Sequence, residues 1–368
     1  MLPFMNNFTP LIQSLPSTIP FVGPETIVRR TGIPLRARIG ANESVFGPSP
    51  KVIAAMQDAA LESWKYGDPE VYDLRKAIAD HHAIAVDNVT VGEGIDGLFG
   101  LAVRLFVEPG VTVANSYGAY PTFNFHVAGF GGTLVTTPYV DDHEDPATLL
   151  DLARREKARL IYFANPDNPM GTSWKADVVQ DLIDNIPKGS LLMLDEAYHD
   201  FAEDTLPPLD MENQNLIRFR TFSKAYGMAG VRVGYALGHP HLISAFDKIR
   251  NHFGVNRMGQ AGAMAALADH GYLTSIKARV TRAREKIYAI ARSNAFQPIQ
   301  SSTNFVSVDC GRDGAFARKI VDGLATQGIF VRMPGVTPLN RCIRISVGTD
   351  ENLGLLEQAL PEVIRAVR

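Results

Sequence analysis

Short apolar runs alternate through the middle of the chain with segments whose apolar residues recur three and four positions apart. The clearest runs are residues 111–113, 133–136, 159–163, 191–194 and 216–220. The runs predict buried strands, and the intervening segments predict amphipathic helices. Strands alternating with helices predict an α/β domain with a largely parallel sheet, in which ligands gather at the carboxyl ends of the strands.

The pattern changes after about residue 265. Long helical stretches then lead to two alternating strands, at residues 301–308 and 342–347, with a helix between them. These features predict a smaller α+β domain. We therefore expect a large domain over residues 40–265, with residues 1–39 and 266–368 forming an N-terminal arm and the small domain.

Composition excludes several classes of protein. The chain has 368 residues, 46% of them hydrophobic and 20% charged, and a net charge of −3 gives no electrostatic case for binding nucleic acid or an anionic membrane. No apolar run reaches the ~18 residues of a membrane helix, and the N-terminus lacks the basic head of a secretory signal. With only two cysteines, we expect no disulfide framework and a cytoplasmic location. No spacing predicts a metal site.

A glycine-rich segment, Gly-Glu-Gly-Ile-Asp-Gly at residues 92–97, follows a short strand and opens a helix. Its pattern is that of a dinucleotide-binding loop, which also needs an acidic residue at the end of the next strand. That strand ends in Asn-Ser-Tyr at residues 115–117, so the nicotinamide interpretation is weak. Backbone N–H groups at the start of the helix still predict an anion site, most often for phosphate.

A second segment combines one lysine with phosphate-binding residue types. Lys224 follows Thr221 and Ser223, and Arg232 comes eight residues later. A lysine amine forms a Schiff base with a carbonyl when burial and cationic neighbours favour its neutral form. An exposed loop lysine is the alternative for Lys224 taken alone.

Two further strand ends carry polar residues. Asp195 ends a buried strand, with Tyr198 three residues later, and Asn168 lies between two prolines. A carboxylate in a crevice of low dielectric needs a cationic partner, and a protonated pyridine nitrogen would serve. Taken singly, Asp195 also fits a helix cap, Tyr198 a core residue and Asn168 a turn.

Together these motifs are more specific. Asn-Pro-Asp-Asn-Pro-Met-Gly at 165–171, Asp-Glu-Ala-Tyr at 195–198, the Lys224 segment and Cys-Ile-Arg-Ile-Ser-Val-Gly at 342–348 occur in that order. The set resembles the pyridoxal-phosphate aminotransferases of fold type I, and is most similar to their histidinol-phosphate aminotransferase branch. The resemblance covers residues 39–348. It implies a seven-stranded, mostly parallel sheet, a pyridoxal 5′-phosphate cofactor and a homodimer with shared active sites.

The resemblance also implies catalytic roles. Lys224 would form the Schiff base with the cofactor and then act as the base that moves the substrate's proton. Asp195 would keep the pyridine nitrogen protonated, so that the ring accepts electrons. Tyr198 and Asn168 would hydrogen-bond the ring's phenolic oxygen, and Tyr120 would stack on the ring.

Phosphate and substrate contacts follow from the same resemblance. The phosphate of the cofactor would lie against Gly94, Ile95, Asp96, Thr221, Ser223 and Arg232, with Tyr66 reaching it from the neighbouring subunit. Arg344 would bind a substrate carboxylate, and Asn42 lies in the substrate-side loop. Phe21 replaces a tyrosine that helps hold the phosphate of histidinol phosphate, and either Arg332 or the basic cluster near Arg29 would compensate.

The activity implied is transfer of an amino group from a histidinol-phosphate-like or aromatic amino compound to a 2-oxo acid such as 2-oxoglutarate. Two alternatives stay open. One is decarboxylation of an amino-acid phosphate with the same cofactor. The other is a regulatory module that binds the cofactor without turnover, although we expect no room in the chain for the DNA-binding domain of such regulators.

Overall fold

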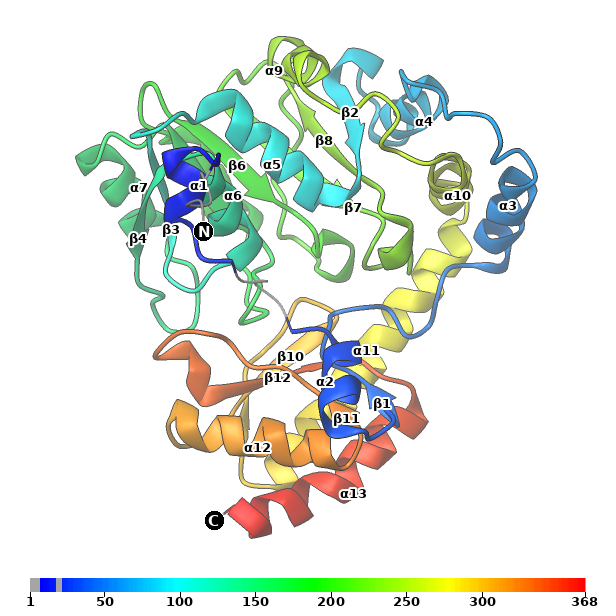
Figure 1. The fold of residues 1–368 in the computed structure, drawn as a ribbon, viewed down its shortest axis with the longest axis vertical. Coiled ribbons are helices and arrows are strands. Elements are labelled where there is room, and N and C mark those ends of the chain that lie inside the picture. Colours follow the sequence, from blue (N-terminus) through cyan, green and yellow to red (C-terminus); the bar gives the residue numbers. More distant parts are fainter. Residues whose placement is uncertain (1–6, 18–21, 368) are drawn as a thin grey trace, which may run out of the picture.

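A seven-stranded sheet dominates the computed structural model, which describes residues 7–17 and 22–367 (Figure 1). Its strands, in spatial order, are β2 (Val89–Gly92), β8 (Gly234–Gly238), β7 (Leu216–Thr221), β6 (Leu191–Asp195), β5 (Leu160–Ala164), β3 (Thr112–Ser116) and β4 (Thr133–Thr137). All neighbours are parallel except β8, which is antiparallel to both β2 and β7. The predicted α/β class with a mostly parallel sheet is confirmed.

Helices cover both faces of this sheet because its central strands are apolar on both sides. In β5, Leu160 and Tyr162 pack with the helices of one face, whereas Ile161 and Phe163 pack with those of the other. The first face carries α5 (Gly94–Phe106), α6 (Pro121–Gly129) and α9 (Pro240–Ala245), and the second carries α7 (Pro146–Arg155) and α8 (Ala176–Asp184). At the β2 edge lie α3 (Pro50–Ala60), α4 (Tyr72–His82) and α10 (Arg257–Leu267).

The C-terminal third forms the predicted smaller α+β unit, below the large sheet in Figure 1. Its antiparallel sheet has the order β12 (Cys342–Ser346), β10 (Phe305–Asp309), β9 (Gln297–Pro298), and β1 (Ala37–Arg38) pairs with β11 (Ile329–Phe330). Its helices are α11 (His270–Ser293), α12 (Gly314–Thr326) and α13 (Asp350–Val367). The domain limits at residues 40 and 265 stay a prediction.

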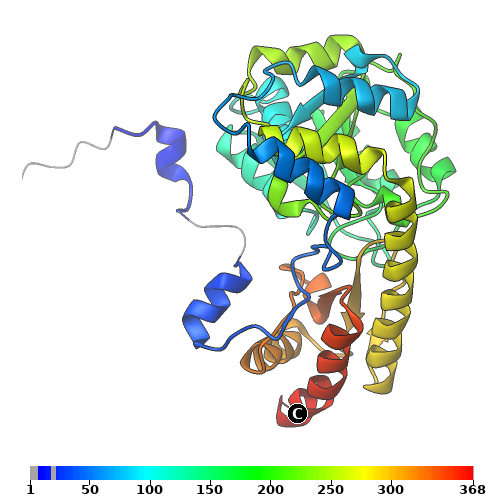
Figure 2. The ribbon, with the colours of Figure 1, turned by 90° about the vertical axis from the view of Figure 1, so that its right-hand side faces the viewer.

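The N-terminal arm contains α1 (Pro10–Ser14) and α2 (Pro24–Thr31). Figure 2 shows α1 standing away from both sheets, and α1 buries none of its residues. Short 3₁₀ turns complete the chain at Val86–Asn88, His199–Phe201, Ala229–Val231, Phe246–Lys248 and Leu339–Arg341. In the parts of the chain that are described, no helix combines the length and apolarity needed to span a membrane.

Two predicted strands begin later than their apolar pattern suggests. Residues 231–237 are a further apolar run that predicts a strand. This strand starts only at Gly234, because Ala229–Val231 is a 3₁₀ turn and Arg232 has a left-handed backbone with φ of 60°. The run expected from residue 301 starts at Phe305, since the hydroxyls of Ser301 and Thr303 bond to the backbone of their own loop. In both places the residues that precede the strand form a loop instead of extending the sheet.

Candidate active site

One cavity of about 380 Å³ lies where the carboxyl ends of β5, β6 and β7 meet the start of α5 and the small unit. The predicted site residues that line it are Asn42, Ile95, Asp96, Tyr120, Asn168, Asp195, Tyr198, Thr221, Ser223, Lys224, Arg232, Arg332 and Arg344. Gly94 directly precedes two of them at the start of α5. Residues from motifs far apart in sequence therefore share one cavity.

Lys224 is held as a buried amine rather than as an exposed loop lysine. Its Nζ donates to the carbonyl oxygen of Asn42 at 3.1 Å and lies 5.5 Å from the centre of the Tyr198 ring. Burial, followed by the charges of Arg344 and Arg232, lowers the pKa of Lys224 to about 8. Much more of this amine is therefore neutral near physiological pH than in an exposed lysine.

Asp195 ends β6 as a nearly fully buried carboxylate. Oδ2 accepts a hydrogen bond of 2.6 Å from the Tyr162 hydroxyl, and Oδ1 accepts one of 2.9 Å from the backbone N–H of Ala197. Burial raises the pKa of Asp195 to about 6, while the Tyr162 hydroxyl and the Ala197 amide oppose that rise. Sequence reasoning missed Tyr162. Its signal was a tyrosine in a buried strand, where the hydroxyl needs a partner.

Asn42 connects the loop after the arm to the rest of the site. Its side-chain amide donates to the Tyr198 hydroxyl at 3.0 Å, and its Oδ1 accepts from Ser346 at 3.1 Å. Its backbone has φ of 55°, in the left-handed region that asparagine tolerates better than most residues. Asn42 therefore orders both Tyr198 and Lys224, in addition to facing the cavity.

The end of the cavity near α5 is narrow and rich in N–H and hydroxyl donors. Arg232 Nη1 reaches Ser223 Oγ at 3.5 Å, and Thr221 Oγ1 accepts from the backbone N–H of Ser223 at 3.1 Å. A Cβ on Gly94, which has φ of +74°, would lie 2.3 Å from Arg232 Nη2. Only glycine lets the start of α5 approach this guanidinium, where helix N–H groups and a cation suit an anion.

At the opposite side, Arg344 is buried and donates to Asn168 Oδ1 at 2.6 Å. Burial lowers the pKa of Arg344 to about 10. Arg332 pairs its backbone with that of Arg344 and donates its Nη2 to the carbonyl of Val22 on the arm. A second cavity of about 720 Å³ shares Arg344, Arg332, Asn168 and Tyr120 with the first and extends toward α2 and α12. The two cavities provide room for a ligand longer than one ring.

Tyr120 and Asp96 complete the wall between these ends. Tyr120 precedes α6, and burial, followed by the charge of Asp96, raises its pKa to about 12. The Asp96 carboxylate lies 3.3 Å from Nε2 of His126 on α6. Tyr120 therefore presents a neutral aromatic ring to the cavity.

Tyr66 is not brought to this cavity. It is 79% exposed and packs against Phe253 with tilted rings whose centres are 4.7 Å apart. Its predicted contact, from a neighbouring subunit, stays a prediction. Phe21 lies outside the described residues.

Behind the site, a buried ion cluster joins β6 to β7. Glu196, which has no exposed surface, accepts from Arg218 at 2.6 Å and from Arg220 at 2.7 Å. These two arginines hold the pKa of Glu196 below its usual range despite the burial of its carboxylate. The cluster fixes the strand ends that carry Asp195 and Thr221.

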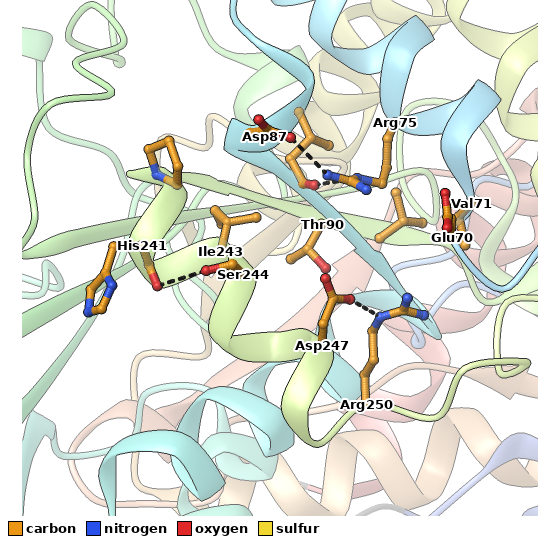
Figure 3. Close-up of a pocket in the computed structure, with 13 residues that line it drawn as sticks. Glu70, Val71, Arg75, Asp87, Thr90, His241, Ile243, Ser244, Asp247 and Arg250 are labelled. Carbon is orange, nitrogen blue, oxygen red and sulfur yellow. Dashed lines mark hydrogen bonds and ion pairs between the residues drawn. The ribbon is translucent and has the colours of Figure 1, made fainter.

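A separate cavity of about 390 Å³ lies at the β2 edge of the sheet (Figure 3). Figure 3 shows Arg75 directed at Asp87, 3.9 Å away, and Arg250 paired with Asp247. None of the predicted site residues lines it. Its two arginines are paired with carboxylates, and no lysine lines it, so it offers no amine comparable to Lys224.

Comparison with known proteins defines the class. The family model "Aminotransferase class I and II" matches residues 38–360. The chain therefore belongs to the class I and II aminotransferases, as its motifs predicted.

Two individual relatives are both histidinol-phosphate aminotransferases. The chain is 33% identical over 363 residues to histidinol-phosphate aminotransferase of Roseiflexus castenholzii, covering 96% of this chain and 97% of that protein. It is 32% identical over 335 residues to histidinol-phosphate aminotransferase 1 of Mesorhizobium japonicum, covering 88% and 90%.

Among solved structures, histidinol-phosphate aminotransferase from Sinorhizobium meliloti, crystallised in complex with pyridoxal-5′-phosphate, matches with a TM-score of 0.97 and 53% identity over 100% of both chains. Aspartate aminotransferase of Thermus thermophilus shares the fold, with a TM-score of 0.82 at 19% identity and coverage of 98% and 100%. The predicted fold type is therefore confirmed.

Proposed function

We propose that this chain is a pyridoxal-phosphate-dependent aminotransferase that takes the amino group from histidinol phosphate and passes it to 2-oxoglutarate. The observation that carries the proposal is the shared cavity, in which Lys224, Asp195 and Arg232 supply an amine, a buried carboxylate and an anion-binding guanidinium. The full-length similarity to the S. meliloti enzyme supports the same activity.

The residues present fit the cofactor. Its phosphate would lie against the start of α5, the hydroxyls of Thr221 and Ser223, and Arg232, whose close approach to α5 depends on Gly94. Its ring nitrogen would face Asp195, since a protonated pyridine supplies the cation that this carboxylate lacks. When bound, the cofactor supplies an electrophilic carbonyl and an electron sink for the carbanion of the substrate.

The chain's own groups then have defined tasks. The lowered pKa of Lys224, about 8, lets its Nζ act as a nucleophile and later accept the proton from the substrate's α-carbon. Asp195 would accept a hydrogen bond from the protonated ring nitrogen. Tyr198, held by Asn42, and Asn168, held by Arg344, would hydrogen-bond the phenolic oxygen of the ring.

Arg344 serves both half-reactions in this proposal. Histidinol phosphate carries its phosphate one carbon from the amine-bearing carbon, close to where glutamate carries its carboxylate. A guanidinium binds either anion with paired hydrogen bonds. Arg332, which lines both cavities, would add a positive charge for the larger phosphate, since Phe21 has no hydroxyl with which to donate a hydrogen bond to it.

Both alternatives are disfavoured by specific observations. A decarboxylase of amino-acid phosphates is not among the relatives described above, which are aminotransferases. A binding module without turnover is disfavoured because the chain is similar over nearly its full length to aminotransferases.

The test is a titration of the cofactor-loaded protein with single amino donors. Histidinol phosphate should abolish the long-wavelength absorbance of the Lys224-bound cofactor, and 2-oxoglutarate should restore it. Absence of that cycle, or an unchanged spectrum in Lys224→Ala, would refute the proposal. Release of carbon dioxide from an amino-acid phosphate would favour the decarboxylase.

We also propose a homodimer with shared sites. Leu61, Trp64, Tyr66 and Phe253 expose apolar or aromatic surface at the β2 edge, and the arm exposes Phe8. A second copy covering this surface would bring Tyr66 to the partner's cavity. Light scattering should give twice the chain mass, and mixing Tyr66→Ala with Lys224→Ala should restore activity if sites are shared. The buried, unpaired Cys310 and Cys342 suit a reducing cytoplasm.

A further inference from the structure

Two buried carboxyl groups that the predicted mechanism does not use lie behind the Asn168 turn. Glu144 precedes α7 and is 1% exposed, and Asp167 follows β5 and is 2% exposed. The carboxyl of Asp167 is a close neighbour of that of Glu144, and Oε2 of Glu144 is buried without a hydrogen-bond donor among the described residues. Among the described residues, neither forms an ion pair with a lysine or arginine, whereas nearby Asp142 pairs with Arg341 at 2.8 Å.

Two unpaired carboxylates cannot both stay ionised when they are buried side by side, because each disfavours the charge of the other. A single shared proton removes the conflict, since the protonated acid becomes a donor to its neighbour. The question is which of the two carries that proton.

The hydrogen-bond donors around the pair place the charge on Asp167. Its Oδ1 accepts from the Tyr139 hydroxyl at 2.8 Å, and its Oδ2 accepts from the backbone N–H of Met170 at 2.8 Å. Glu144 accepts one backbone bond, from Ala164 at 3.3 Å, which is at the long end of the range, and the Ser116 hydroxyl lies beside it. Asp167 accepts two bonds of 2.8 Å and is near the charge of Arg344, so its anion is the better stabilised and the proton is assigned to Glu144.

Asp167 in turn braces the turn that carries Asn168. Its backbone N–H donates to the carbonyl of Thr172 at 2.8 Å, and the Met170 contact closes the same turn. Asn168, the next residue, accepts from Arg344. An ionised Glu144 would repel Asp167 and loosen this turn at the contact with Arg344.

We propose that Glu144 is a positioning residue that stays protonated at neutral pH, donates to the Asp167 carboxylate and thereby fixes the turn that presents Asn168 to Arg344. The role of Asn168 and Arg344 rests on the proposed function. Burial, followed by the charge of Asp167, raises the pKa of Glu144 well above its usual range, in agreement with this assignment. The other polar and titratable groups that face the pair are Ser116, Tyr139, Tyr162 and Arg344.

Matched conservative variants test the assignment. Glu144→Gln keeps a neutral donor beside Asp167, so KM for the amino donor should stay within about twofold of the natural value. Asp167→Asn leaves the Tyr139 hydroxyl or the Met170 amide without an acceptor, and should raise KM about tenfold or more with a smaller effect on kcat. An equal rise in KM in both variants, or failure of Glu144→Gln to fold, would overturn the proposal.

Infrared spectroscopy of the purified protein gives a measurement that does not depend on amino transfer. At a pH above the ionisation of Asp195 and Asp200, whose pKa values burial raises to about 6, and of Asp167, whose pKa burial raises to about 7, a protonated carboxyl band should persist. Glu144→Gln should abolish that band. Its absence from the natural protein would overturn this inference alone, whereas failure to transfer an amino group would overturn the proposed function alone.

Discussion

Replacing Tyr162 with phenylalanine tests how the chain controls the charge of Asp195. The substitution removes one hydroxyl that donates 2.6 Å to Oδ2 and leaves a ring of nearly the same shape in the core. The Ala197 amide remains as the other donor. The change is therefore confined to the hydrogen bonding of one buried carboxylate.

The magnitude follows from the strength of a hydrogen bond to a buried charge. Such a bond contributes about 1.5–3 kcal/mol, and one pKa unit corresponds to about 1.4 kcal/mol, so the pKa of Asp195 should rise by about 1–2 units. Since the pKa of Asp195 in the chain without cofactor is about 6, Asp195 in the variant would be partly protonated at neutral pH when it meets the cofactor. A protonated Asp195 no longer offers a full negative charge to the ring nitrogen. Activity should therefore fall at the acidic end of its pH profile.

The assay is kcat/KM for amino transfer from histidinol phosphate, measured as a function of pH. The acidic limb of the kcat/KM profile should move to higher pH in Tyr162→Phe. The value of kcat/KM should recover as the pH rises. Tyr288→Phe is the control, because it removes a buried hydroxyl that accepts from Ser301 in the small unit. An unmoved limb in Tyr162→Phe, or the same displacement in Tyr288→Phe, would refute the reasoning.

Two further substitutions probe the framework of the site. Gly94→Ala puts a Cβ 2.3 Å from Arg232 and strains a positive φ, so cofactor affinity, measured by fluorescence titration, should fall about tenfold or more. Gly97→Ala, whose Cβ meets only ordinary contacts at 3.6 Å, should bind normally; equal losses would contradict the explanation. Glu196→Gln should cost about 3–5 kcal/mol in chemical denaturation because it breaks a buried ion cluster. The exposed pair lost in Glu156→Gln should cost under about 1 kcal/mol, and similar costs would argue against burial as the cause.

Much of the large domain was predictable because its signals are local. The central strands are continuous apolar runs, and each ends in a polar motif, so their parallel alignment alone gathers Asn168, Asp195 and Thr221 at one edge. The helix beginning at Pro50 was predictable for a similar reason. Ser49 caps it by accepting from the Val52 N–H at 3.2 Å.

Contacts between distant segments were harder to predict. Asn42 meets Ser346 across 304 positions, and Asn168 meets Arg344 across 176. Their hydrogen bonds depend on how the small unit packs on the large sheet, which no local pattern specifies. The start of β8 was misjudged because the loop at Arg232 is shaped by contacts with α5.

The most direct test of the central claim follows the amino nitrogen itself. Histidinol phosphate with isotopically labelled amino nitrogen is incubated with the protein, pyridoxal phosphate and 2-oxoglutarate, and the products are identified by mass spectrometry. The proposed function predicts labelled glutamate together with an equal amount of the ketone phosphate, and neither product with Lys224→Ala. Unlabelled glutamate, or label transfer that persists in Lys224→Ala, would contradict it.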